Sequence, residues 1–273
     1  MNAISKIFTL KEKLCCVTLD FEMDYGDRVG EFNIINNNAE LAELGSCFSG
    51  LKVPVSTFIR TDLLSRYPKT LELIQKIAGD YHCHSHTHAT QNFNSKEEIY
   101  QTASTFEKYF GRIPLGYRAP QGLLHEGDIE LIRDNGFKFS SSVFPSFRPG
   151  KFNYLSMPTE PFLYDNGILE LPFAVVPLIR YIISLSYLKL IGFPANNALY
   201  SIFGLPNVLI FDSHLHDYIV NEESFKKLPL KLRLAWGMNK YSGMKYFEKF
   251  VSLLGGKGYK FITMSDLYHR LLE

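Results

Sequence analysis

The stretch "LCCVTLD", residues 14–20, is an apolar run of strand length that ends in one acidic residue. Such runs are typical of strands whose two faces are both buried, as in a parallel sheet covered by helices. The stretch "VPVSTFI", residues 53–59, has the same character. Between the two, the sequence predicts a helix from Asn38 to Gly50, where the glycine ends it. This strand–helix–strand order indicates a parallel sheet.

The alternation continues along the chain without a Pro/Ser-rich linker or an internal repeat. Further helices are predicted over residues 69–79, after the capping-box sequence "SKEE" at 95–98, and over 127–136. Further strands are predicted at residues 80–83, 115–118, 137–143, 168–174, 207–214 and 259–263. The pattern predicts an α/β fold in which about seven parallel strands form an open sheet or a barrel. In a barrel, the chemistry lies at the C-terminal ends of the strands.

The composition predicts a globular protein with one large domain over residues 1–273, because 46% of the residues are hydrophobic. The formal net charge of +1 provides no global field that would attract nucleic acid. The four cysteines lack CxxC spacing, which indicates reduced thiols. The first residues lack the apolar run of a signal peptide, so we expect a cytoplasmic protein.

The stretch "YHCHSHTHAT", residues 81–90, holds half of the histidines of the chain. In an extended strand, the Cα atoms of His84 and His88 would be roughly 13 Å apart, too far for one metal ion. In a helical turn, residues four apart are neighbours. Because "DYHC" ends a strand and "HSHTH" turns toward the next helix, we expect His84 and His88 to bind the metal, with His82 and His86 on other faces. The alternative is a set of solvated loop histidines; a zinc protease is disfavoured, since Ser85 stands where its glutamate would be.

An acidic cluster follows the first predicted strand, in "TLDFEMDYGDR" at residues 18–28. Its members are Asp20, Glu22, Asp24 and Asp27. Carboxylates this close repel one another unless a cation lies among them. A metal site at this strand end is therefore one interpretation, and a solvated acidic loop is the other.

Two further polar clusters follow predicted strands. "GYRAPQG" at 116–122 places Arg118 in a short turn before a proline, where a surface salt bridge is the simplest reading. "FDSHLHDY" at 211–218 places His214, His216 and Asp217 after an apolar run. One histidine there would be structural, but two beside an aspartate favour acid–base chemistry.

In order and approximate spacing, these clusters resemble the motifs of the polysaccharide deacetylase family, the NodB-homology carbohydrate esterases. The first motif resembles "TLDFE", the second "HSHTH", the third "RAPQG" and the fifth "HLHD", and the resemblance runs from about residue 14 to residue 265. It implies a distorted (β/α) barrel and a metal-dependent hydrolase that cleaves carbon–nitrogen bonds other than peptide bonds. Asp20 would match the general base, His84 and His88 two metal ligands, Arg118 the partner of the base, and His216 the general acid. One divalent metal ion is implied, with zinc as the first choice.

The sequence departs from the family pattern at two places. The first motif of the family has two adjacent acids, but Phe21 follows Asp20 here. Glu22 would then be the third metal ligand, with Asp24 as the second choice. Ser140 stands where relatives often carry an aspartate, which puts the support from the fourth motif in question.

One apolar segment and one basic segment lie outside these motifs. Residues 171–193 are strongly apolar but are interrupted by Arg180 and Lys189, so they do not form a membrane span. We expect a helical insertion around residues 176–206. Residues 225–247 carry six basic residues and no acid. The two segments indicate either a core or lid helix with a solvated basic face, or a surface that meets anionic lipid or a lipid-linked sugar.

Together, these observations predict a cytoplasmic, metal-dependent enzyme that removes an acyl group, with N-acetyl as the first choice, from an amino sugar, a polysaccharide or a lipid-linked glycan precursor. The expected partner is the N-acylated carbohydrate and not nucleic acid, with peripheral membrane contact left open. The alternatives are a hydrolase of a small cyclic amide in the same superfamily and a non-catalytic protein that holds a metal and binds carbohydrate. Asp20 and His216 argue against the last, since binding alone needs neither a base nor an acid. The oligomeric state is open.

Overall fold

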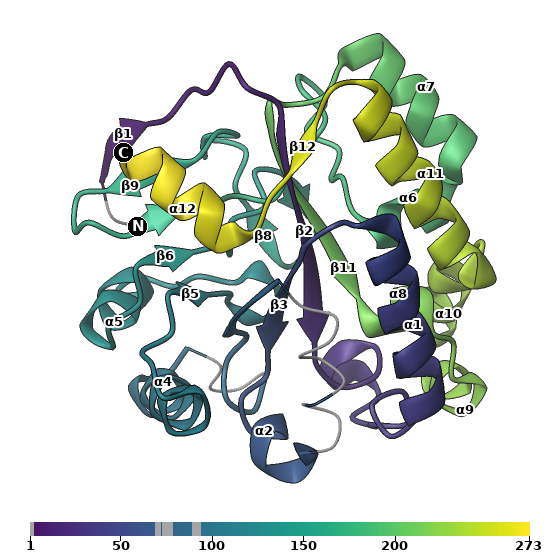
Figure 1. The fold of residues 1–273 in the computed structure, drawn as a ribbon, viewed down its shortest axis with the longest axis horizontal. Helices are drawn as coiled ribbons and strands as arrows, with labels where there is room; N and C mark the ends of the chain where they lie inside the picture. Colours follow the sequence, from purple (N-terminus) through teal and green to yellow (C-terminus); the bar gives the residue numbers. More distant parts are fainter. Residues whose placement is uncertain (1–2, 69–71, 73–78, 89–93) are drawn as a thin grey trace.

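The computed structural model describes residues 3–68, 72, 79–88 and 94–273 of the chain (Figure 1). Its main sheet is 10-stranded. The strands are β1 (Ile4–Ile7), β2 (Leu14–Phe21), β3 (Val55–Ile59), β4 (Asp80–Cys83), β5 (Gly116–Tyr117), β6 (Phe139–Ser140), β9 (Phe162–Tyr164), β10 (Leu169–Glu170), β11 (Val208–His214) and β12 (Lys260–Phe261). A separate hairpin is formed by β7 (Phe147–Arg148) and β8 (Phe152–Asn153).

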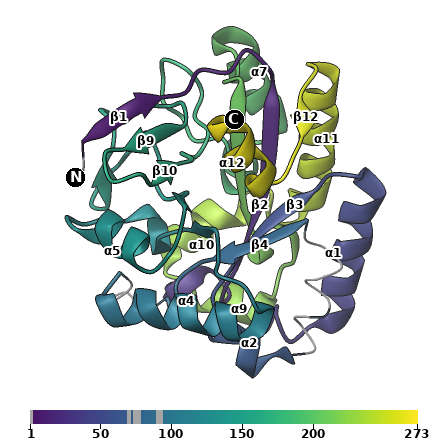
Figure 2. The ribbon, with the colours of Figure 1, turned by 60° about the vertical axis from the view of Figure 1, so that its left-hand side comes forward.

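The strand order is β1-β9-β10-β6-β5-β4-β3-β2-β11, and β12 pairs with the start of β2. All neighbours from β10 to β11 are parallel. The sheet curls into a half-barrel (Figures 1 and 2), which confirms the predicted distorted barrel. The sheet also has an antiparallel edge that the sequence pattern does not predict, in which β1 pairs with β9 and β9 pairs with β10.

Helices cover the curled sheet (Figure 2). They are α1 (Asn38–Leu51), α2 (Leu63–Arg66), α4 (Lys96–Phe110), α5 (Asp128–Asp134), α6 (Leu185–Ile191), α7 (Phe193–Phe203), α8 (Leu215–Tyr218), α9 (Glu222–Lys227), α10 (Leu230–Gly237), α11 (Gly243–Gly256) and α12 (Met264–Leu272). The helices predicted from Asn38, after Ser95 and over 127–136 are confirmed as α1, α4 and α5. The predicted helix 69–79 lies mostly outside the described residues.

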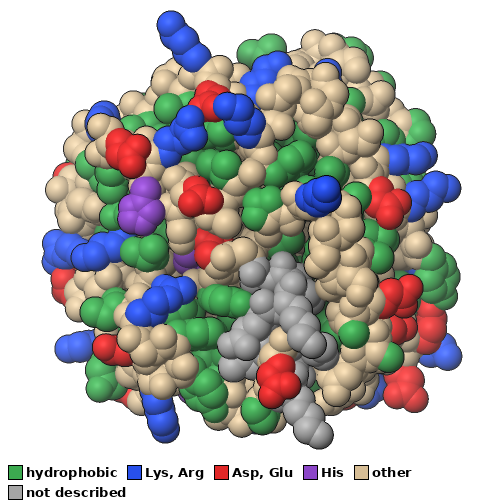
Figure 3. All heavy atoms as spheres, viewed as in Figure 1, with side chains coloured by type: hydrophobic (Ala, Val, Ile, Leu, Met, Phe, Trp, Pro, Cys, Tyr) green, Lys and Arg blue, Asp and Glu red, His purple; other side chains and the backbone are tan. Residues whose placement is uncertain are grey.

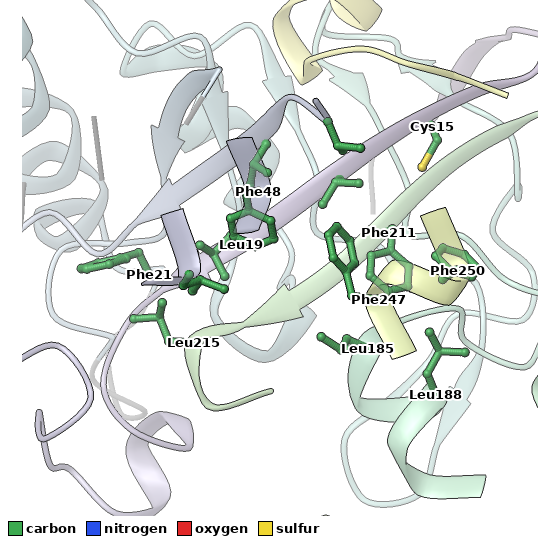
Figure 4. Close-up of a cluster of buried hydrophobic side chains, with 14 of the residues drawn as sticks. Cys15, Leu19, Phe21, Phe48, Leu185, Leu188, Phe211, Leu215, Phe247 and Phe250 are labelled. Carbon is green, nitrogen blue, oxygen red and sulfur yellow. The ribbon is translucent and has the colours of Figure 1, made fainter. Parts of the chain in front are cut away.

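β2 has two faces with different partners, because successive side chains of a strand point in opposite directions. Its outward-facing side chains, which are every second residue from Cys15 to Phe21, pack against helices in one core cluster (Figure 4). Its inward residues Leu14 and Cys16 belong to the barrel interior, where α12 contributes Met264 and Leu267. The next inward residues of β2 are Thr18 and Asp20, so the interior changes from apolar to polar toward the C-terminal end of the strand.

The apolar segment 171–193 belongs mainly to the core. Phe173, Ile183 and Leu188 are buried, and α6 lies against α11 and α7 (Figure 1). The expected insertion around 176–206 contains α6 and α7. Over the described ranges, every helix is too short or too polar to pass through a bilayer. On the face seen in Figure 3, acidic and basic side chains are intermixed, in keeping with the small net charge.

We predict that Gly243→Ala destabilises the protein, because a Cβ atom at this position would overlap the carbonyl oxygen of Asp217 in α8. Overpacking against backbone costs about 1–3 kcal/mol or more of the free energy of unfolding. The matched control is Gly255→Ala in the same helix, where a Cβ atom meets nothing within 4 Å. The control should leave stability unchanged or raise it by up to about 1 kcal/mol. Urea denaturation of both variants tests this; equal stabilities would contradict the close packing of α11 on α8.

Candidate active site

The polar clusters of the sequence meet at the C-terminal ends of neighbouring strands. Asp20 lies at the end of β2, His84 directly follows β4, Arg118 directly follows β5, and His214 ends β11. A pocket opens over them. Its walls also carry aromatic side chains, namely Tyr25, Phe144, Phe152, Phe173, Tyr187 and Trp236. A parallel half-barrel thus places its polar side chains on one face, as expected for this architecture.

Asp20 and Arg118 form a buried ion pair at the floor of the pocket. The Nη1 atom of Arg118 lies 2.5 Å from Oδ1 of Asp20, and it also donates to the hydroxyl of Thr18 at 3.0 Å. The same nitrogen is 3.3 Å from Oδ1 of Asp212 on β11. The guanidinium therefore ties the ends of β5, β2 and β11 together and fixes the orientation of the Asp20 carboxylate.

The other side of Arg118 is held by the loop after β6. Its Nε donates to the Ser141 carbonyl, and its Nη2 donates to the Ser141 hydroxyl, both at 3.2 Å. The loop is held in turn by Glu170 of β10, whose Oε1 accepts from the backbone N–H groups of Ser142 (2.7 Å) and Val143 (2.8 Å). Burial raises the pKa of Glu170. This carboxyl group is not among the residues predicted from the sequence, although a lone acid within the apolar run "ILELPFA" is a signal for it.

Ser140 takes part in the same network, and its hydroxyl donates to that of Ser142 at 2.9 Å. Ser140 and Glu170 are paired residues on the adjacent strands β6 and β10. A carboxyl group thus lies next to Ser140, on the neighbouring strand, and supports the loop that holds Arg118.

The spacing of Asp20, Phe21 and Glu22 follows from strand geometry. Phe21 points outward into the helix-covered core, so the residues on either side of it point inward together. The Glu22 carboxylate is buried, and its Oε2 lies 2.8 Å from Nε2 of His88 and 3.4 Å from Nε2 of His84. Burial opposes its ionisation, but the two histidines outweigh burial and hold the pKa of Glu22 well below its usual range.

The carboxylate of Asp24, the second choice for the third metal ligand, accepts hydrogen bonds from the backbone instead. It accepts from the N–H groups of Asn33 and Ile34, each at 3.1 Å, and from the Ser224 hydroxyl at 2.6 Å. It therefore closes the loop after β2. The side chain of Asp27 lies outside the described part of the structure.

A tight turn after β4 brings His84 and His88 together, with a ring-centroid distance of 4.9 Å. Ser85 and His88 have positive φ angles of 58° each, and the Ser85 hydroxyl accepts from the His88 backbone N–H. The buried carboxylate of Glu98 accepts from the backbone N–H groups of His86 and Thr87. Glu98 thus anchors the turn. Its own backbone N–H donates to the Ser95 hydroxyl, which caps the start of α4.

The two other histidines of this stretch point elsewhere. His82 is buried between the rings of Phe58 and Phe139, and its Nε2 lies 2.9 Å from Asp80. His86 lies 3.0 Å from the hydroxyl of Thr61 through its Nδ1. Neither belongs to a described group of potential metal ligands that converge within 4.8 Å.

Glu22, His84 and His88 do form such a group. Two imidazoles and one carboxylate are a ligand set that zinc uses in catalytic sites, where the fourth position stays open. His84 places Nδ1 3.1 Å from the carbonyl oxygen of Arg118, and a bond there would leave Nε2 as the ligand atom. The donor chemistry therefore fits a divalent cation, and the pocket provides access to it.

His214 lies beside this group. Its Nε2 is 3.8 Å from Asp20 and 3.9 Å from Glu22, and its Nδ1 is 3.5 Å from Asp217. Burial disfavours the imidazolium, but the carboxylates of Asp212, Asp217 and Asp20 outweigh burial and raise the pKa of His214 to about 10. Burial, opposed in part by His214, raises the pKa of Asp212 to about 6. Asp217 is buried and is held by Lys189 and Ser186.

His216, the sequence-based candidate for the acid, lies in the pocket wall. Its ring stacks on His214 at 4.9 Å and packs against Tyr25 at 4.7 Å and Trp236 at 5.5 Å. Burial lowers its pKa to about 3. Because β11 ends at His214 and α8 begins one residue later, the two histidines have different neighbours.

Several solved structures share this fold. A protein from Mycobacterium smegmatis assigned as a polysaccharide deacetylase has a TM-score of 0.61 and 16% identity, over 99% of this chain and 95% of that chain. A second protein assigned to this activity, from Pseudomonas aeruginosa, has a TM-score of 0.58 and 13% identity, over 94% and 89%. An allantoinase has a TM-score of 0.56 and 14% identity, over 94% and 89%. Neither a family model nor a curated protein sequence matches the chain. The structures confirm the fold that the resemblance implies.

We predict that His88→Ala weakens zinc binding at least tenfold, because it removes one of three converging ligand atoms. The matched control is His86→Ala, two residues away in the same turn, which should bind zinc like the wild type. In a second pair, Glu22→Ala should weaken zinc binding in the same way, and its control Asp24→Ala should bind zinc like the wild type. Calorimetric zinc titration of the metal-free variants tests both pairs, and loss of binding in His86→Ala with retention in His88→Ala would contradict the ligand set.

Proposed function

We propose that the chain is a metal-dependent hydrolase of the polysaccharide deacetylase family that removes an acyl group, in the first instance N-acetyl, from an amino sugar. The observation that carries the proposal is the convergence of Glu22, His84 and His88 beside the buried pair of Asp20 and Arg118. The fold likeness to two proteins assigned as polysaccharide deacetylases supports it. A zinc ion held by the three ligands would polarise the amide carbonyl and acidify a water molecule.

Asp20 acts as the general base in this proposal. Arg118 holds its Oδ1, whereas Oδ2 is directed toward the ligand group, 3.7 Å from Nε2 of His84. A water molecule that enters between Oδ2 and the ligand atoms would be within reach of the carboxylate. Arg118 keeps the carboxylate in one orientation and excludes rotation away from the pocket, which makes it a positioning residue.

For the general acid, the geometry favours His214 over the sequence-based candidate His216. His214 is half-buried and faces Asp20, and Asp217 lies against its Nδ1, so Nε2 is the atom that points to the reacting groups. A proton on this nitrogen would be transferred to the departing amine, which is otherwise a poor leaving group. His216 stacks behind His214 and supports its ring.

The pocket walls suit a sugar ring. Aromatic side chains supply flat apolar faces, while Ser184, Gln121 and Arg148 supply hydrogen-bonding groups at the wall. The shape likeness to an allantoinase supports a second candidate, a hydrolase of a small cyclic amide. The two candidates differ in product. Deacetylation releases a free carboxylic acid, whereas opening of a cyclic amide leaves the new acid and amine groups in one molecule.

We predict that the zinc-loaded wild type releases acetate from at least one member of a panel of N-acetylated sugars, and that Asp20→Asn lowers the rate by about 10²–10⁴-fold while it retains zinc. The rate falls because an amide cannot accept the proton. Acetate release and zinc content are measured on the same preparations. A wild type that binds zinc and the sugars but releases no acid would leave a non-catalytic binding protein as the function.

We predict further that His214→Ala lowers acetate release by about 10²–10⁴-fold, the usual contribution of a general acid. His216→Phe keeps an aromatic ring in the stack and should retain most of the rate. The two variants are compared in kcat with one substrate. A large loss of rate in His216→Phe with little loss in His214→Ala would make His216 the general acid, as the sequence motif suggests.

A further inference from the structure

α10 carries large apolar side chains on its solvent-exposed face. Leu230 and Leu234 are 60% and 65% exposed, and Met238, which follows the helix, is also exposed. Residues four apart lie on the same side of a helix, so these three form one stripe, the helix stripe. No residue of α10 is fully buried. On the opposite side of the helix, Trp236 lines the pocket, so α10 forms part of the pocket wall and the helix stripe lies on the outer side of that wall.

A second exposed apolar group, the apolar tip, lies close in the chain to Arg148 and Ile182, which line the same pocket. It comprises Phe147 of β7 and residues Leu178 and Ile179 of the loop after β10. Leu178 is 87% exposed and has a φ of 66°, a conformation that leucine rarely adopts. The Ser146 hydroxyl donates to the Arg180 carbonyl at 2.7 Å and ties the two segments together.

Positive charges accompany both apolar groups. Lys231 and Arg233 flank the helix stripe and form no ion pair with any residue that the structure describes. Arg148 follows Phe147 directly and lines the pocket. Residues 225–247 contain no acid, and two of their six basic residues, Lys227 and Lys240, pair with Glu31 and Glu222 from outside the segment. The outer side of the pocket wall thus combines exposed apolar side chains with cationic ones on two separate elements.

We propose that the outer side of the pocket wall docks on an anionic membrane surface, with the helix stripe and the apolar tip inserted among the lipid headgroups. Exposed leucines and neighbouring basic residues are two of the features of segments that bind at a membrane interface. Docked in this way, the pocket lies beside the bilayer surface, so its substrate is an N-acylated sugar attached to a membrane lipid. The statement about substrate rests on the proposed function, whereas the docking itself does not.

The test is co-sedimentation of the full chain with vesicles of phosphatidylcholine alone or mixed with phosphatidylglycerol. We expect binding to the anionic vesicles that weakens when the salt rises from about 0.05 to about 0.5 M. Leu230→Ser with Leu234→Ser should lower the partition coefficient at least about tenfold, since the apolar area no longer leaves water. Lys231→Glu with Arg233→Glu should lower it by a similar factor on anionic vesicles only. Leu178→Asn, which tolerates the left-handed backbone, should lower it severalfold.

Matched controls separate these effects from general changes. Ile202→Ser alters a residue of α7 that is 72% exposed, and Lys96→Glu with Lys108→Glu reverses two exposed charges on α4, away from α10 (Figure 1). Both controls should bind vesicles like the wild type. Absence of wild-type binding to anionic vesicles, or equal losses in controls and test variants, would overturn the proposal. So would a wild-type dimer in sedimentation velocity that Leu230→Ser with Leu234→Ser turns into a monomer, since the stripe would then join two copies of the chain.

Failure of docking and failure of the proposed function give different results. Vesicle binding is measured without substrate, and acetate release is measured separately on a soluble N-acetylated sugar without vesicles. The helix-stripe and charge variants should retain that release, because none of these residues lines the pocket. Binding without any release would keep the docking surface and remove the deacetylase, and release without binding would do the reverse.

Discussion

Arg118 joins three strands from inside the half-barrel through its contacts with Asp20, Asp212 and the Thr18 hydroxyl. A buried guanidinium is costly to remove from water unless its donors are satisfied and opposite charge lies nearby. Here two carboxylates and the Ser141 oxygens meet its donors, while the rings of Phe58 and Phe173 lie 3.8 and 4.4 Å from its Cζ. Without Arg118, the carboxylates of Asp20 and Asp212 would lie close together with only His214 beside them to offset their charge.

The same residue marks the boundary between two parts of the barrel interior. Below it, Leu14, Cys16 and Met264 fill the space with apolar atoms. Above it lie the carboxylates and imidazoles of the candidate site. A charged pair at this boundary is stabilised by polar neighbours on one side and closed off from water by the core on the other. The site therefore has a rigid floor, which acid–base chemistry requires for correct distances.

The sequence predicts the parts of this structure that depend on local patterns. β2, β3 and α1 follow from apolar runs and a helix stop, and the turn that joins His84 to His88 follows from their spacing. The edge strands β1 and β9 escaped prediction, because short strands at a sheet edge need only a few apolar residues. The placement of His214 and His216 relative to Asp20 also depends on where β11 ends, which the sequence pattern does not show. Parallel pairing with β2 sets His214 opposite Asp20, and no spacing rule shows that.

α6 connects the candidate acid with the proposed docking surface. Lys189, near its end, bonds the Asp217 carbonyl at 3.1 Å, and the Asp217 carboxylate accepts from the His214 backbone N–H. The Lys189 carbonyl accepts from the Asn239 side chain at 2.8 Å, directly after Met238 of the helix stripe. One buried residue thus fixes both the loop that carries His214 and the end of α10. Because Lys189 and Asp217 are both buried, replacing Lys189 would leave the Asp217 carboxylate with His214 as its remaining close basic partner, so the helix stripe and the candidate acid share one point of support.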